Sequence, residues 1–200
     1  DLRSVTTGQA NKAKFGSSRS IEDVNKLNKE IKQKDAAIER VGQLKKLVIE
    51  GNTSPAAYKK AIEKMSEKEK LALGPEYLKN TEVLKHLSKS DFEAIKKSED
   101  ISDDDKVEIK KQRMEALRHS IDQGASQIDE TKNMLKSMEP EDIIKLEDSY
   151  LQDPNLIVHL TTEQLKKIAE GSASTDTKHK IAEKILAWRV NPTDPQHKAF

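Results

Sequence analysis

The apolar positions of this chain recur at a fixed distance along the sequence. A shift of 73 residues (138 − 65) superimposes two stretches, residues 65–97 and 138–170, whose matching positions are mostly apolar. The clearest pairs are Met65 with Met138, Leu73 with Leu146, Tyr77 with Tyr150, His86 with His159, Leu87 with Leu160 and Ile95 with Ile168. Matched apolar residues indicate that each copy buries the same surface against a neighbour. The pattern predicts two related units.

A long helix is expected over residues 21–50, before these units. Ser20 and Asp23 have the spacing of a capping box, and Gly51 supplies the stop. Apolar residues keep a seven-residue rhythm in this helix, at Val24, Leu27, Ile31, Ile38, Val41 and Val48. Lys34 and Lys45 interrupt the row. Such a row packs along another long helix, as in a coiled-coil hairpin.

The same rhythm returns later in the chain and offers a partner for this helix. The second row consists of Val107, Met114, Leu117, Ile121, Ile128 and Leu135, and it is broken near Gly124-Ala125. Self-association through the N-terminal helix is a further possibility that the heptad pattern allows.

Short helices are expected everywhere else. Capping spacings occur at Ser66 with Glu69, Ser88 with Asp91, Ser102 with Asp105, Ser126 with Asp129 and Thr161 with Gln164. Another helix starts at Ser54-Pro55, and Pro75, Pro140 and Pro154 suit first helical positions. The last helix covers residues 175–190, with Ile181, Ile185 and Trp188 on its apolar face. No sustained alternation or hairpin signal favours strands.

These patterns predict an all-α fold in which two related short-helix units stack into an elongated, superhelical body of the α-solenoid kind, with a long N-terminal helix. The expected organisation is a flexible tail or linker over 1–20, the long helix with the first unit over 21–124, the second unit over 125–190 and a tail over 191–200. Hydrophobic residues make up only 34% of the chain and charged residues 36%, which favours a narrow apolar spine over a deep core.

Charge and cysteine content narrow the choice of partners and compartment. The 36 Lys and Arg residues nearly balance 35 Asp and Glu residues, so no overall field attracts nucleic acid or an anionic membrane. Cysteine is absent, which excludes disulfides and suits a reducing, cytoplasmic location. No apolar run is long enough for a membrane span. Because the chain starts at Asp1, we expect a processed product or a piece of a larger protein.

The residue types that could carry chemistry have structural explanations here. His86 and His159 share a repeat position at the expected end of a short helix, where a cationic ring suits exposed carbonyls. Asp103-Asp104-Asp105 lacks the glycine and glutamate spacing of a calcium loop and suits the first turn of a helix. Tyr77 and Tyr150 are expected at the edges of small cores, and Trp188, on the apolar face of its helix, is expected in a core.

No phosphate-binding loop, nucleophile elbow, dinucleotide fingerprint or zinc motif is present in the sequence. Pairs of lysines are interleaved with acids, which is typical of a solvated, salt-bridged surface; they occur at 45–46, 59–60, 96–97, 110–111 and 166–167, with Lys12 and Lys14 near the start. We therefore expect no catalytic, cofactor-binding or metal-ligating residues and no cofactor. The expected function is a non-catalytic scaffold or protein-interaction module, the soluble part of a larger assembly or of a membrane-linked protein. A nucleic-acid-associated protein that uses local lysine patches is the alternative, and an enzyme comes third.

Overall fold

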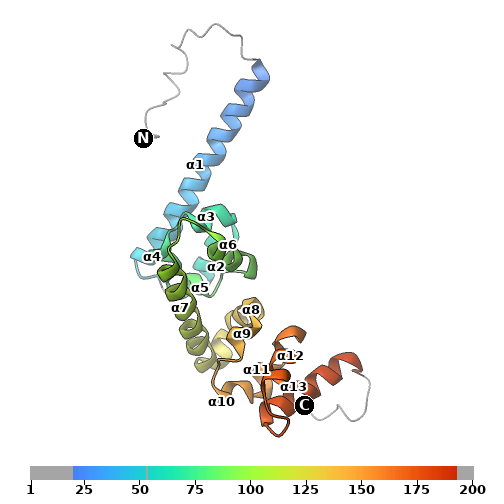
Figure 1. Ribbon diagram of the computed structural model, residues 1–200. Helices are drawn as coiled ribbons and strands as arrows, with labels where there is room; N and C mark the ends of the chain where they lie inside the picture. Colours follow the sequence, from blue (N-terminus) through green and yellow to red (C-terminus); the bar gives the residue numbers. More distant parts are fainter. Residues whose placement is uncertain (1–19, 53, 193–200) are drawn as a thin grey trace. The chain divides into compact units, whose positions relative to one another are not determined.

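The computed structural model describes residues 20–52 and 54–192, and every regular element in these ranges is a helix (Figure 1). The expected all-α class is thereby confirmed. The chain divides into two compact units, residues 1–39 and residues 40–200, and α1 (Ile21–Ile49) runs from the first into the second. No helix in the described part is long and apolar enough to cross a membrane. The expected tails, 1–20 and 191–200, lie almost entirely outside the described residues.

The helices after α1 are short, apart from α7 and α13. In chain order they are α2 (Pro55–Glu63), α3 (Glu67–Leu71), α4 (Pro75–Leu78), α5 (Thr81–Leu84), α6 (Lys89–Lys97), α7 (Asp103–Asp122), the 3-10 turn η1 (Gly124–Gln127), α8 (Ile128–Ser137), α9 (Pro140–Ile143), α10 (Asp148–Leu151), α11 (Pro154–Ile157), α12 (Thr162–Gly171) and α13 (Thr177–Val190). Isolated helices of this length are unstable in water, so each depends on burying one face against its neighbours.

Most of the predicted helix starts are confirmed. Complete capping boxes form at Ser66, Ser88 and Thr161, where the hydroxyl accepts from the backbone N–H three residues on. The expectation for residue 126 is wrong, because α8 begins at Ile128 with Gln127 at its N-cap and no side-chain cap. The reason is η1, which begins at Gly124 with a φ of 62° and occupies the residues up to Gln127, so the α-helix starts only at Ile128.

Two separate hydrophobic cores lie in the unit of residues 40–200. The first joins Leu44 of α1 to α2 and to the helices up to α7, which contributes Ile109. The second joins Met114 and Leu117 of α7 to the helices from α8 to α13. Leu87 and Leu160, predicted to point into these cores, are both buried. α7 is therefore shared by the two cores.

Helix bounds and buried positions agree between two parts of the chain at the 73-residue distance. The starts of α2 and α8 differ by 73 (128 − 55), and α3 to α6 precede α9 to α12 by the same number. The corresponding apolar residues are buried in both parts: Ile62 and Leu135, Met65 and Met138, Leu73 and Leu146, Leu78 and Leu151, Val83 and Leu156, Leu84 and Ile157, Ile95 and Ile168.

The expected rhythm of the second long row is partly wrong. Val107 is 67% exposed, and Ile109 lies in the core instead. The break predicted near Gly124 is present, because α7 ends at Asp122 and the chain turns at Gly124. The buried residues of α7 follow the three- and four-residue spacing of an ordinary amphipathic helix: Ile109, Arg113, Met114, Ala116, Leu117 and Ser120.

Trp188 was expected in a core but is 45% exposed. It lies near the end of α13, beside Val190, which is 87% exposed. Leu44, Leu117 and Val190 are spaced 73 residues apart (117 − 44 and 190 − 117). The two leucines are buried, whereas Val190 is exposed. In the described part of the chain no helix follows α13.

Candidate functional site

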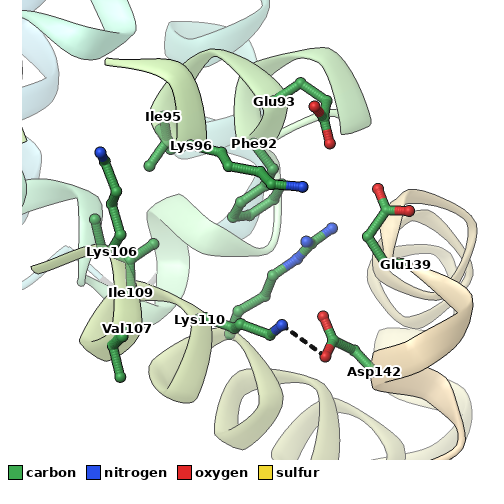
Figure 2. A pocket seen from close by; sticks show the side chains of 11 residues that line it. Phe92, Glu93, Ile95, Lys96, Lys106, Val107, Ile109, Lys110, Glu139 and Asp142 are labelled. Atoms are coloured by element: carbon green, nitrogen blue, oxygen red, sulfur yellow. Dashed lines mark ion pairs between the residues drawn. The ribbon is translucent and has the colours of Figure 1, made fainter. Parts of the chain in front are cut away.

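A pocket of about 220 Å³ lies between α6, α7 and the start of α9 (Figure 2). Its lining combines apolar and charged side chains: Phe92, Glu93, Ile95, Lys96, Lys106, Val107, Ile109, Lys110, Arg113, Glu139 and Asp142. In Figure 2, Glu139 and Asp142 approach from the side of α9, opposite the α6 residues Glu93 and Lys96. A concave pocket that combines apolar and polar side chains is the usual form of a ligand-binding or active site.

Arg113 is the least expected member of this lining. Its side chain is only 6% exposed, its guanidinium carbon lies 3.3 Å from the centroid of the Phe92 ring, and Nη2 donates a 2.8 Å hydrogen bond to Ser137 Oγ. Burial lowers the pKa of Arg113 to about 10, against the opposing influence of Asp142 and Glu139. Since that value is still well above neutrality, Arg113 remains a cation that links α7 to α6 and α8.

Two of the three acids of the pocket, Asp142 and Glu139, lie close to lysines. Asp142 Oδ1 accepts from Lys110 Nζ at 2.8 Å and from Lys145 Nζ at 3.1 Å. Burial is the largest single influence on the pKa of the Asp142 carboxyl, and it raises that pKa. The hydrogen bonds and charges of Lys110 and Lys145 lower it, and together they outweigh burial, so the pKa of Asp142 is below its ordinary value. Glu139 lies 3.6 Å from Lys89. Among the lining residues described here, no nucleophile is hydrogen-bonded to a base.

Sequence reasoning did not single out Arg113, although the repeat offered a signal. Arg113 follows Arg40 by 73 residues (113 − 40), and Asp142 follows Glu69 by the same distance (142 − 69). In the structure Arg40 Nη2 pairs with Glu69 Oε1, and Asp142 is a charged neighbour of Arg113. The ion pair itself is not repeated, because Asp142 pairs with Lys110 and Lys145 and Arg113 donates to Ser137.

His86 and His159, 73 residues apart, are half-buried and belong to no metal site in the described part of the chain. Burial is the main cause that lowers the pKa of His86 and of His159. The expected cationic role at a helix end is therefore disfavoured near neutral pH for both rings. His86 lines a small hollow with Glu63, Asp129 and Glu130. No group of three or more metal-ligating residues is found in the ranges the structure describes.

The other candidate residues lie in helix starts and core edges. Asp103, Asp104 and Asp105 occupy the first turn of α7, and the hydrogen bond from Lys79 Nζ at 2.6 Å is the main cause that lowers the pKa of Asp105. Tyr150 donates a hydrogen bond to Asp122 Oδ1 at 2.9 Å. Lys45 Nζ lies 4.8 Å from the centroid of the Tyr77 ring. These contacts connect helices to each other and converge on no common site.

Basic residues gather in one surface hollow of about 500 Å³, between the end of α1 and α2. Arg40, Lys46, Lys60 and Lys64 line it, with Glu50 as the acid. Lys46 pairs with Glu50 at 3.7 Å and Arg40 with Glu69, whereas Lys60 and Lys64 form no salt bridge with described residues. Lys12 and Lys14 fall outside the described residues.

The first half of α1 exposes a row of large apolar side chains. Ile21, Val24, Leu27, Ile31 and Ile38 have exposed fractions between 43% and 81%. Four of them keep heptad spacing, with Val24, Ile31 and Ile38 at a positions and Leu27 at a d position. We call this row, residues 24, 27, 31 and 38, the α1 seam. Each of these four side chains is at least 43% exposed. Pairing of this row with the row from Val107 onward stays a prediction.

Comparison of the sequence with protein-family profiles, curated proteins and solved structures finds no match. The functional conclusion therefore depends on the geometry alone.

Proposed function

We propose that this chain is a non-catalytic interaction module that binds a helix of another protein along the α1 seam. The observation that carries the proposal is the heptad-spaced row of exposed apolar residues in the first half of α1. Contiguous exposed apolar surface with polar surroundings is characteristic of interaction sites in soluble proteins. The a and d positions of a helix bind another helix by inserting into the holes of its facing side.

The rest of the chain serves this function as a scaffold. We infer that α2–α6 and α8–α12 are copies of one unit, stacked in the manner of an α-solenoid and joined by α7. The equal helix bounds and the matching buried positions at a distance of 73 residues support this inference. Stacked units share stability through their interfaces, which gives a rigid support from short helices.

Nucleic-acid association is the second candidate, and one observation favours it. Lys60 and Lys64 form no salt bridge with described residues and line the basic hollow beside Arg40 and Lys46. Against it, acids lie among the other lysine pairs, as in the contacts of Lys110 with Asp142 and of Lys111 with Glu108. Salt-dependent binding of duplex DNA at low micromolar protein, weakened by Lys60→Gln, would support this candidate. The interaction module predicts only weak, non-specific binding at physiological salt.

The interaction module is tested with a labelled synthetic helix and the whole chain. The probe is an amphipathic peptide of about three heptads with Ile and Leu at a and d and Gln at the flanking positions. We expect fluorescence anisotropy to show saturable binding that Ile31→Lys weakens at least about tenfold, because a charge replaces an apolar side chain in the seam. Lys29→Gln, on the opposite side of α1, is the matched control and should bind as the parent does. Equal binding by Ile31→Lys, or no binding by the parent, would contradict the proposal.

A further inference from the structure

The charges of α1 are distributed unevenly around its exposed row. At about 100° per residue, Asp23 and Glu30 fall beside the α1 seam on one flank, and Asp35 falls beside it on the other. Three lysines, Lys26, Lys29 and Lys32, fall on the opposite side of the helix. Asp23, Glu30 and Asp35 are exposed. In heptad terms the acids occupy the g and e positions, which decide the choice of partner in coiled coils.

The acids beside the α1 seam make few contacts with other described residues. Asp23 caps the start of α1 by accepting from Ser20 at 3.1 Å. Glu30 and Asp35 form no salt bridge with a described residue. The lysines on the far side cannot neutralise them across a facing helix, because they point away from it. The negative flanks are therefore available to a partner.

A second copy of this chain is a poor occupant of the α1 seam. In a parallel pair each g residue faces the e residue five positions later in the other helix, which would place Glu30 opposite Asp35. In an antiparallel pair g residues face g residues, which would bring Glu30 and Asp23 together. Both arrangements place like charges opposite each other, which opposes pairing. Self-association through α1, allowed by the spacing of the apolar residues, is disfavoured by these charges.

We propose that the partner of the α1 seam is an amphipathic helix with an apolar face flanked by lysine or arginine residues. This inference rests on the proposed function and specifies the partner's chemistry. The partner's basic flanks face Asp23, Glu30 and Asp35, while its apolar face contacts Val24, Leu27, Ile31 and Ile38. Lys34, which occupies a d position within the row, favours an acid or amide at the facing core position of that helix. Helices with acidic flanks are disfavoured as partners, because their acids would face the acids of α1.

Three matched peptides test this inference on the whole chain. All have Ile and Leu at a and d, and they carry Lys, Gln or Glu at the e and g positions. We expect the Lys peptide to bind about tenfold or more tightly than the Glu peptide, with the Gln peptide between them, as measured by anisotropy at low salt. Raising the salt concentration should reduce the difference, because these charges are exposed.

A charge-reversal variant tests whether the order of the peptide affinities is set by the acids beside the α1 seam. In the double variant Glu30→Lys and Asp35→Lys, the Glu peptide should bind more tightly than the Lys peptide. The control Lys26→Glu and Lys29→Glu alters the far side of α1 and should retain the order of the parent. Circular dichroism of each variant checks that the helix content is unchanged.

The outcomes separate this inference from the function on which it rests. If all three peptides bind the parent with equal affinity, the seam binds helices but the basic-partner inference is wrong. The same conclusion follows if the double variant keeps the order of the parent. If no peptide binds, both proposals fail. If sedimentation shows that the chain dimerises and that Ile31→Lys abolishes the dimer, a second copy is the occupant and the inference is overturned.

Discussion

The third residue of α6 and the third residue of α12 both cap the start of their helix, but their other contacts differ. Asp91 in α6 caps Ser88 and accepts from Lys70 Nζ at 2.8 Å, so a buried carboxylate is neutralised by a lysine of α3. Gln164 in α12 caps Thr161 and donates from Nε2 to the carbonyls of Leu135 and Met138, each at 2.7 Å. The two residues are 73 positions apart (164 − 91), and both are buried.

The comparison separates what defines the unit from what can vary within it. The apolar residues agree between α2–α6 and α8–α12, whereas the polar link between neighbouring helices is an ion pair in one and a pair of neutral hydrogen bonds in the other. Either link satisfies the requirement that a buried polar group has a partner. The two parts should consequently react differently to polar substitutions and similarly to apolar ones.

Removing an equivalent core leucine from each part should have the largest effect. Leu87→Ala and Leu160→Ala should each lower the free energy of unfolding by about 2–5 kcal/mol, because both side chains are buried and leave a cavity. The double variant should be largely unfolded near body temperature, since a typical domain is stable by only about 5–15 kcal/mol. Thermal melts followed by circular dichroism measure this. Val107→Ala, at an exposed position of α7, is the control, and melting points within a degree of the parent for the leucine variants would contradict the buried placement.

Changing the charge of each capping side chain should have the next largest effect, and the effect should differ between the two parts. Gln164→Glu should destabilise by about 3 kcal/mol, because a carboxylate would face two carbonyl oxygens without a cation. Asp91→Asn should cost only about 1–2 kcal/mol, since the amide still caps Ser88 but no longer neutralises Lys70. Urea titrations of both variants compare the two costs. Equal losses would show that the surroundings of the two positions are interchangeable.

Acid should weaken both parts through equivalent carboxylates. The pKa of Asp142 and that of Glu69 are lowered in the folded chain, so the stabilisation is present above their unfolded pKa values and is lost as the pH falls through the folded values. Asp142→Asn should cost about 1–2 kcal/mol at neutral pH and reduce the difference in stability between neutral and acid solution. Glu69→Gln should change the pH dependence in the same direction. Urea unfolding at several pH values measures both, and an unchanged acid slope would contradict the role of these carboxyls.

The smallest effect concerns the two histidines. Because the pKa values of His86 and His159 are lowered in the folded chain, the unfolded chain binds more protons, and stability is lost as the pH falls below the ordinary histidine value of 6.5. An NMR titration of the ring protons should place both pKa values below 6.5. A value above 6.5 for either ring would restore the cationic role that its place after a short helix suggested.

Local signals predicted much of the fold, and environment accounts for what was missed. The capping spacings at Ser66, Ser88 and Thr161 were sufficient because both partners of a capping box lie within one helical turn. The exposure of Trp188 could not be read from its spacing, because an apolar face is buried only where another element covers it. Arg113 was missed for a related reason: its stacking on Phe92 joins residues of different helices.

The candidate interaction site was partly visible in the sequence. The heptad spacing of Val24, Ile31 and Ile38 predicts packing along another long helix, either the row from Val107 onward or a second copy of this chain. Spacing shows that a helix has an apolar side and does not show which neighbour covers it. The exposure of these residues in the structure supports the proposal that a helix of another protein binds them.

The sharing of α7 by two cores has a consequence for how this chain comes apart. Ile109 belongs to one core and Leu117 to the other, only eight residues (117 − 109) further along the same helix. A protease that cuts within α7 would open both cores, so the segments on either side should not survive as separate fragments. Heating should likewise melt residues 40–200 in one cooperative transition, with the two cores failing together.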